Sequence, residues 1–301
     1  MPSVVISARG EERLHGGHPW IYRADVADVQ ASAGDIVQVR SRRGGRPLGS
    51  ALFSDRSQIS LRMLAYGDHV ADETLVRRRL DAAIRFRASL EIDATAYRLV
   101  HGEADLLPSL IVDRYGEHLV VQALSQGMDR LLPVVVSTLE ELLHPKGILA
   151  RNDPRARQLE GLEQRVEVLA GDVPETVMVT EVGIDYDVDL RRGQKTGLFL
   201  DQRENRAAAA AYARGRLLDC FSYNGGFALV LGRRSQETIA IDVSEDAVAR
   251  VRRNAARNGV AVDAQTHVTV VEKRMQGRDH PVMLGVPETY YLKCFILRKL
   301  A

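Results

Sequence analysis

Two acidic residues and a glycine pair have the spacing of a nucleoside-binding site. The segment LLDCFSYNGGFAL (217–229) has the pattern of a strand, a glycine turn and the start of a helix, and such a junction directs backbone amides at a ligand. The segment ETIAIDVSEDAV (237–248) adds a second strand that ends in Asp242. A carboxylate there can accept two charge-assisted hydrogen bonds from a ribose diol. The separation of Asp219 from Asp242 predicts one β-α-β step.

The glycine turn lacks the G-x-G-x-x-G pattern that seats a pyrophosphate. We therefore favour a nucleoside without phosphates, which indicates S-adenosylmethionine. Two other interpretations stay open at this point: a doubly wound domain with an incidental acid, and a nucleotide-dependent oxidoreductase on a Rossmann sheet. The glycine pattern argues against the oxidoreductase.

The elements that position these residues follow three patterns along the chain. Residues 1–68 hold short β-rich runs between Gly, Ser and Arg turns, which is typical of a small barrel or sandwich. Residues 72–90 predict a helix with Asp72 as its cap. Residues 95–175 predict a second unit that includes a hairpin and a helix over 128–143. The last part predicts a hairpin over 177–189, helices over 201–213, 226–232 and 244–258, and strands over 217–221 and 238–242.

Composition and charge fit an ordinary soluble α/β protein of two or three domains. The chain has 301 residues, 45% apolar and 27% charged, with a net charge of +1, so it has no global polyanion-binding charge. Two cysteines exclude a disulfide scaffold and a cysteine-based zinc site. No histidine spacing predicts a metal site. No apolar run is long enough to span a membrane and the start has no signal-peptide pattern, so we expect a cytoplasmic protein.

Four stretches resemble one protein family in the family's own order. D-C-F-S-Y-N-G-G-F resembles the first motif of class I S-adenosylmethionine-dependent methyltransferases. GQKTGLFLDQRENR (193–206) resembles a signature of the PUA-domain methyltransferases that make 5-methylcytosine in large-subunit (23S) ribosomal RNA. Residues 98–122 resemble that family's central domain, and residues 17–26 with 34–44 its N-terminal PUA barrel. Residues 268–300 resemble its C-terminal strands.

The resemblance implies three domains and a set of cofactor contacts. A PUA-like RNA-binding domain would span 1–70, a linker helix and central α/β domain 71–176, and a Rossmann-like methyltransferase domain 177–301. The cofactor S-adenosylmethionine would be held by residues of the first motif, by the end of the second strand and by the upstream signature. These residues are Phe221, Ser222, Tyr223, Asn224, Gly225, Gly226, Asp242, Val243, Ser244, Lys195, Thr196, Phe199, Asp201, Gln202 and Arg203.

An arginine cluster is the candidate RNA contact of the first domain. Arg40, Arg42, Arg43 and Arg46 gather at one strand end and the turn that follows it, and such cations position an RNA backbone. A solvated turn is the competing interpretation. Ribosomal RNA is the expected partner, a homodimer is compatible with the sequence, and no membrane partner is expected.

The nucleophile that the family's reaction needs is absent from the sequence. Cytosine C5 is a poor nucleophile, and family enzymes add a Cys thiolate to C6 to activate it. Cys220 lies inside the first motif and Cys294 in the last apolar run, and both fit small buried hydrophobes better. The sequence passes from 257–264 to 266–273 with no third, fourth or fifth strand, so on the order of 80 residues are missing for a complete sheet. We expect a junction near 264–267 where the segment that carries the catalytic Cys is missing. Either the sequence leaves out residues that the protein contains, or the protein has a true deletion there. In the second case the chain is a non-catalytic RNA-binding protein on the same scaffold.

Overall fold

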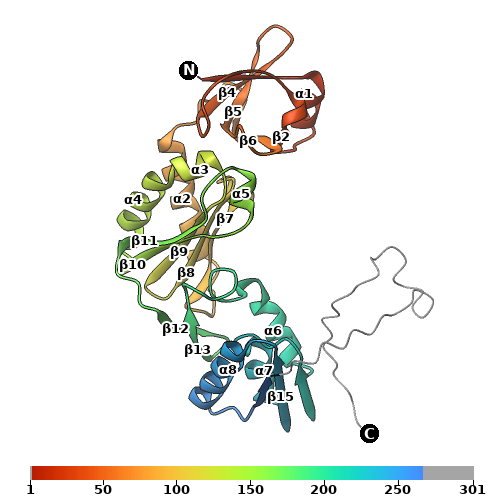
Figure 1. The fold of residues 1–301 in the computed structure, drawn as a ribbon, viewed down its shortest axis with the longest axis vertical. Coiled ribbons are helices and arrows are strands. Elements are labelled where there is room, and N and C mark those ends of the chain that lie inside the picture. The colour runs from red at the N-terminus through yellow and green to blue at the C-terminus, as the bar shows by residue number, and fades with distance from the viewer. Residues whose placement is uncertain (1, 267–301) are drawn as a thin grey trace, which may run out of the picture. The chain divides into compact units, whose positions relative to one another are not determined.

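The computed structural model describes residues 2–266, which form two compact units (Figure 1). The first unit contains residues 2–177 and 189–197, and the second contains residues 178–188 and 198–266. The chain therefore passes between the units three times. Within residues 2–266, no helix combines the length and the apolar character that crossing a membrane requires.

The N-terminal part of the first unit is a six-stranded sheet with the order β2-β6-β5-β4-β1-β3. Its core is apolar, with Val4, Ile21 and Leu61 fully buried. Helix α1 (Ala8–His15) begins where the Ser7 hydroxyl accepts the Gly10 amide at 3.2 Å. The strands are β1 (Ser3–Ile6), β2 (Trp20–Tyr22), β3 (Val26–Gln30), β4 (Ile36–Ser41), β5 (Pro47–Phe53) and β6 (Ile59–Tyr66), and a 3₁₀ turn, η1, spans Arg23–Asp25.

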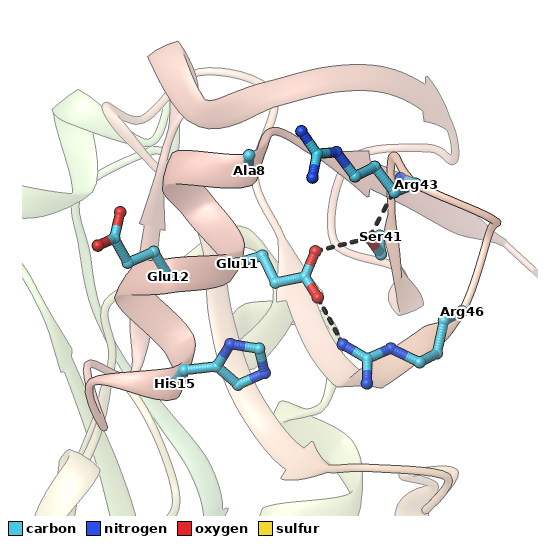
Figure 2. Close-up of a pocket in the computed structure, with 7 residues that line it drawn as sticks. All are labelled: Ala8, Glu11, Glu12, His15, Ser41, Arg43 and Arg46. Atoms are coloured by element: carbon cyan, nitrogen blue, oxygen red, sulfur yellow. Dashed lines mark hydrogen bonds and ion pairs between the residues drawn. The ribbon is translucent and has the colours of Figure 1, made fainter.

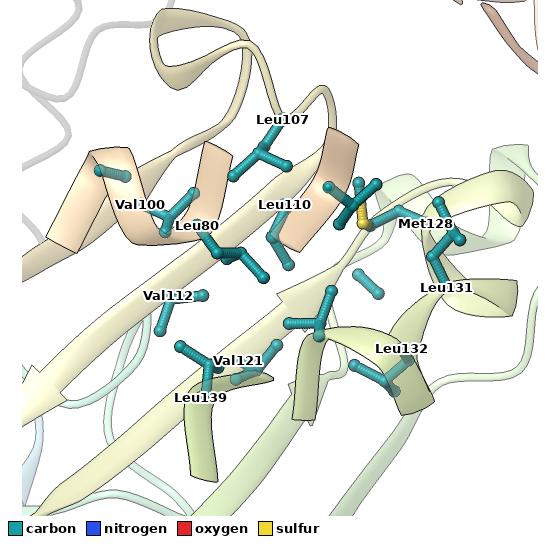
Figure 3. Close-up of a cluster of buried hydrophobic side chains, with 14 of the residues drawn as sticks. Leu80, Val100, Leu107, Leu110, Val112, Val121, Met128, Leu131, Leu132 and Leu139 are labelled. Atoms are coloured by element: carbon teal, nitrogen blue, oxygen red, sulfur yellow. The ribbon is translucent and has the colours of Figure 1, made fainter. Parts of the chain in front are cut away.

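The rest of the first unit is a five-stranded sheet with the order β11-β10-β9-β8-β7. Leu80 of helix α2 and Leu139 of helix α4 pack with Val112 and Val121 of the sheet in one buried cluster (Figure 3). The predicted cap is confirmed, because the Asp72 carboxylate accepts the Leu75 amide at 2.9 Å. The strands are β7 (Ala96–His101), β8 (Leu110–Tyr115), β9 (His118–Ala123), β10 (Gly147–Asn152) and β11 (Arg165–Gly171). The helices are α2 (Glu73–Ala88), η2 (Gly102–Asp105), α3 (Gln126–Arg130), α4 (Leu132–Leu143) and α5 (Ala156–Leu159).

The expectation of one continuous helix over 128–143 is wrong. Helix α3 ends at Arg130, and α4 begins at Leu132 with Pro133 in its first turn. Proline has no amide to donate and is tolerated only at a helix start, so the chain restarts its helix there.

The second unit carries a hairpin and a parallel sheet with the order β14-β15-β16. Val182 and Gly183 both have positive φ in the predicted hairpin turn. Helix α8 holds this hairpin, because Asn254 and Asn258 accept the amides of Asp187 and Asp185 at 2.9 and 2.8 Å. The strands are β12 (Thr176–Glu181), β13 (Ile184–Asp189), β14 (Arg216–Asp219), β15 (Glu237–Asp242) and β16 (Asp263–Thr266). The helices are η3 (Leu200–Gln202), α6 (Arg203–Ala210), α7 (Gly226–Gly232) and α8 (Glu245–Asn258).

Strand β16 corrects the expectation that the sequence has no third parallel strand. It pairs with β15 in parallel register, with Ala264 opposite Ala240. Its sequence, Asp-Ala-Gln-Thr, has weak strand propensity, and Ala264 is the one residue of the strand that is buried. The pairing with β15 therefore overrides the local signal. The expected junction continues from His267 onward, outside the described residues, and so do the C-terminal strands expected over 268–300 and Cys294.

Candidate cofactor-binding site

The turns that follow β14 and β15 lie at one edge of the parallel sheet. The two strands run in parallel with Asp219 opposite Ala240, so their carboxyl ends face the same side, where open α/β sheets bind ligands. The Ser222 amide donates to the Ile241 carbonyl at 3.1 Å and ties the first turn to the end of β15. The chain thus places the two halves of the predicted nucleoside site side by side.

Asp242 joins these two turns through both of its carboxylate oxygens. One oxygen accepts the Tyr223 amide at 2.8 Å, and the other accepts the Ser244 amide at 3.0 Å. Each carboxylate oxygen has a second acceptor position, and the residue is half-buried rather than enclosed. Asp242 can therefore fix both turns and still accept hydroxyl groups from a ribose.

The turn 220–225 has a backbone shape that requires its glycine. Tyr223 and Gly225 have φ of +46° and +83°. A Cβ on Gly225 would lie 3.2 Å from the Leu229 side chain, in addition to the strain of the left-handed conformation. The sharp turn brings the Gly225 amide within 2.7 Å of the Ser222 carbonyl. The curled backbone holds the first motif close to the sheet edge.

Ser222 offers a test of whether a ligand fits this edge. Its hydroxyl oxygen is buried and has no hydrogen-bond partner among the described residues. Buried polar atoms in folded proteins nearly always have a partner. Phe221 and Val243, at 49% and 71% exposure, lie in the two turns at the same sheet edge. A polar group for Ser222 and an apolar surface for a purine ring are what S-adenosylmethionine would supply and use, so the residues fit that cofactor.

Asp219 is buried beneath the first turn and accepts the Ala228 amide at 3.1 Å. Burial raises the pKa of its carboxyl group to about 6, and the charge of Asp242 raises it further against the hydrogen bonds that oppose the shift. Asn224 is also buried, and it accepts Arg250 Nε at 3.0 Å through its side chain. Both side chains hold the turn from below rather than facing the open edge.

The upstream signature is divided between the two units. Lys195 and Thr196 belong to the first unit, where Thr196 is buried and donates to Asp113 Oδ2 at 2.6 Å. Phe199 belongs to the second unit, and its ring meets Tyr223 edge-on at 5.4 Å between ring centroids. The remaining predicted residues, Asp201, Gln202 and Arg203, lie on η3 and at the start of α6.

Sequence reasoning missed two charged residues that lie buried beneath the site. Arg206 of α6 forms an ion pair with Glu181 of β12, and both side chains are buried. Arg206 is the last residue of the GQKTGLFLDQRENR signature, and that position was its only signal. Glu181 had none, because its partner lies 25 positions away.

The predicted arginine cluster divides by its contacts. Figure 2 shows Glu11 pointing from α1 toward Ser41 and Arg46, both of which donate to it at 2.6 Å. These bonds lower the pKa of the Glu11 carboxyl group. Arg40 donates to the Gly45 carbonyl at 3.0 Å. The four arginines, Arg40, Arg42, Arg43 and Arg46, thus lie together at the end of β4 and in its turn, beside a cavity of about 460 Å³ that Arg43 and Arg46 help to line.

No set of His, Cys, Asp or Glu side chains within residues 2–266 could hold a metal ion. Cys220 is half-buried next to Asp219. It lies in the turn directly after β14 and is not the fully buried side chain that the sequence predicted.

Two family descriptions match the chain. Residues 4–66 match a PUA-like domain, and residues 98–273 match an S-adenosylmethionine-dependent methyltransferase. The fold and the matches therefore define the class of the chain, which joins an N-terminal PUA-like domain to a Rossmann-like domain of the S-adenosylmethionine-dependent methyltransferases. The chain belongs to this S-adenosylmethionine-dependent methyltransferase family.

Two relatives of the chain share one name. Ribosomal RNA large subunit methyltransferase I of Tolumonas auensis is 38% identical over 85% of this chain and 66% of the relative. The protein of the same name from Erwinia tasmaniensis is 37% identical over 86% of this chain and 67% of the relative. The chain spans about two thirds of the length of these relatives.

Solved structures share the fold at lower sequence identity. A Streptococcus mutans protein described as an S-adenosylmethionine-dependent methyltransferase has a TM-score of 0.75 at 20% identity, covering 89% of this chain and 71% of that one. A methyltransferase structure in complex with S-adenosylhomocysteine (SAH) has a TM-score of 0.76 at 20% identity, covering 88% and 69%. These likenesses show the fold of this chain.

Proposed function

We propose that this protein methylates C5 of a cytosine in large-subunit ribosomal RNA, with S-adenosylmethionine as the methyl donor. The names of the relatives, at 36–38% identity over most of this chain, support ribosomal RNA as the substrate. The PUA-like domain supports RNA binding. The observation that carries the proposal is the sheet edge at which Asp242 joins both turns beside the buried Ser222 hydroxyl.

Each residue of the proposed site has its own role in the reaction. The bound cofactor supplies an electrophilic methyl group on its sulfonium. Asp242 accepts the ribose hydroxyls, Ser222 binds a polar group of the cofactor, and Phe221 with Val243 covers the adenine. The exposed Arg42 and Arg43 contact RNA phosphates. The thiolate that must add to cytosine C6 is expected outside the described residues.

Tritiated methyl transfer tests the proposal directly. The protein is incubated with tritiated S-adenosylmethionine and large-subunit ribosomal RNA that lacks the modification, and the RNA is digested to nucleosides. We expect the label in 5-methylcytidine, and the Asp242→Ala variant should lose most of it. Label in another nucleoside would overturn the cytosine assignment and leave the methyltransferase assignment in place.

A non-catalytic RNA-binding protein on this scaffold is the second candidate, because neither Cys220 nor Cys294 fits the role of nucleophile. It predicts that the protein binds SAH and RNA while no label enters the RNA. The intact mass of the purified protein separates the two candidates further, because residues missing from the printed sequence would add to 33.4 kDa.

The cellular setting follows from the substrate. We propose that the protein acts in the cytoplasm, and fractionation of cells that express it would test this. A homodimer is a separate expectation, which the sedimentation coefficient of the purified protein tests.

A further inference from the structure

A buried guanidinium lies directly beneath the glycine pair of the first motif. A Cβ added to Gly226 would lie 2.6 Å from Arg206 Nε and 2.9 Å from its Cζ. Only a residue without a side chain leaves room for the flat guanidinium at this position. Arg206 is 5% exposed, so this contact excludes water.

The same guanidinium reaches the upstream signature. Arg206 donates to the Phe199 carbonyl at 3.1 Å, and the Phe199 ring packs edge-on against Tyr223 of the turn. The Tyr186 hydroxyl of β13 also donates to the Gly226 carbonyl, at 3.4 Å. Arg206 therefore connects the two sequence motifs that would surround the cofactor, and every one of these residues lies in the second unit.

Glu181 fixes the orientation of Arg206 at the cost of its own solvation. It is completely buried, and it accepts a hydrogen bond from Arg206 through one oxygen. The other oxygen, like Arg206 Nε, has no hydrogen-bond partner among the described residues. A buried ion pair with such unfilled positions is weak evidence for stability, and orienting a functional group is one reason to retain it.

We propose that Arg206, oriented by Glu181, is a positioning residue for the cofactor: it holds the Phe199 segment and the turn Ser222–Gly226 in the geometry that binds S-adenosylmethionine. This inference rests on the proposed use of that turn. Arg206 touches neither the cofactor nor the RNA in this account, and it acts through the two backbone segments that it joins.

The experiment compares two variants of the pair and one control variant with the parent, all in the full chain. Arg206→Lys keeps the charge and loses the planar group beneath Gly226. The double variant Glu181→Leu with Arg206→Met replaces the pair by apolar side chains, a change that often preserves folding. Arg257→Lys, at an exposed position of α8, is the matched control. Calorimetric titration with SAH gives the affinity, thermal unfolding gives the stability, and methyl-transfer kinetics separate KM for S-adenosylmethionine from kcat.

We expect about a tenfold or greater loss of SAH affinity in both pair variants, because lysine loses the planar group beneath Gly226 and methionine cannot donate a hydrogen bond to the Phe199 carbonyl. KM for S-adenosylmethionine should rise by a similar factor while kcat at saturating cofactor changes less, and the control should match the parent. The double variant should melt near the parent and still bind SAH weakly, a separation that a purely structural role would not produce. Binding within twofold of the parent in a folded pair variant would overturn the inference alone. A parent protein that does not bind SAH would instead overturn both the inference and the proposed function.

Discussion

Two carboxylates lie at the same edge of the sheet and have opposite environments. Asp242 is half-buried and accepts two backbone amides from neighbouring turns. Asp219 is buried under the first turn. Both end a strand of the same sheet, and the difference arises because the first turn covers Asp219 and leaves Asp242 half-exposed.

For Asp242 we predict that the Ala variant loses most cofactor affinity. Removing a carboxylate that accepts two ribose hydroxyls should cost about 2–3 kcal/mol, or tens- to a hundredfold in the dissociation constant. Calorimetric titration with SAH measures it. Asp242→Asn, which keeps one acceptor oxygen, should fall between the Ala variant and the parent. An unchanged dissociation constant in the Ala variant would remove Asp242 from the site.

Asp219 should make the stability of the protein depend on pH. Its pKa in the folded state, about 6, lies above the ordinary value of 3.8, so the folded state binds this proton more tightly than the unfolded state. Its contribution to stability is therefore fully present below about pH 4 and is lost as pH rises through about 6. The loss is on the order of 2–3 kcal/mol.

Urea unfolding between pH 4 and 7 tests this prediction. The difference in unfolding free energy between the parent and Asp219→Asn should fall across that range, because asparagine does not titrate. Asp263→Asn, at an exposed position of β16 in the same sheet, serves as the control and should show no comparable trend. A parent and an Asp219→Asn variant with parallel pH profiles would contradict the raised pKa.

The turn after β4 has two kinds of arginine. Glu11 on α1 holds Arg46 in an ion pair, whereas Arg42 and Arg43 are exposed with no side-chain ion pair among the described residues. A guanidinium already bound to a carboxylate has less net charge to offer a phosphate. The sequence predicted one cluster of four arginines, and the structure distinguishes the paired Arg46 from the exposed Arg42 and Arg43.

We predict that replacing Arg42 and Arg43 by alanine flattens the salt dependence of RNA affinity. Each lost phosphate contact should lower the slope by about 0.7 on single-stranded RNA. Arg46→Ala should change the slope less, and SAH affinity should stay the same in all of these variants. Titrations at several salt concentrations give the slopes. If alanine at all four positions leaves the slope unchanged, the turn is a solvated surface and RNA binds elsewhere.

Helices and strands that are specified by their own local sequence were predicted correctly. The strand–turn–helix at 217–229 and the helix over 244–258 are confirmed, because glycine turns and apolar periods lie within the residues that they specify. Helix α1 was missed since only Gly10 and Leu14 of its eight residues are buried, which leaves no apolar period. Strand β16 was missed because its pairing partner, not its composition, makes it a strand.

The contacts of the site that could not be predicted from the sequence are those between residues far apart in the chain. Thr196 belongs to a signature that resemblance places at the cofactor, yet its hydroxyl bonds Asp113, 83 positions earlier in the chain. Arg206 and Glu181 meet only after the hairpin and α6 have packed. A single sequence shows which residue types could bind a nucleoside, and it contains no signal for which distant side chains hold them.

A buried ion pair joins the two sheets of the first unit. Arg62 of β6 meets Glu160, after α5, at 2.8 Å, with side chains 9% and 2% exposed. Glu160 also accepts the Gln126 amide at 3.2 Å. The N-terminal sheet and the five-stranded sheet should therefore unfold together.

We predict that Arg62→Ala destabilises the first unit by about 3–5 kcal/mol, because it leaves Glu160 buried without its partner. Trp20, the one tryptophan of the chain, reports on the N-terminal sheet by fluorescence, and circular dichroism reports on all helices. The unfolding midpoints that the two probes report should both move to a lower urea concentration. Arg56→Ala is the control: it removes an exposed ion pair, in which Arg56 Nε lies 3.9 Å from Asp55 Oδ1, and should change the unfolding free energy by less than about 1 kcal/mol. A fluorescence midpoint that stays fixed in Arg62→Ala would show that the N-terminal sheet unfolds independently.

The three passages of the chain between its units make the molecule hard to dismantle. A protease that nicks one passage cuts the chain into two fragments, but at each of the three passages at least one unit then contains segments of both fragments, so noncovalent packing still holds them together. A gene truncated to begin at Leu198 would discard the residues 178–188 that contribute to the second unit, and Asn254 and Asn258 would lose the amides that they accept. Transplanting the methyltransferase unit into another protein therefore requires carrying the hairpin along on an artificial linker, because no single cut point in the gene encodes that unit whole.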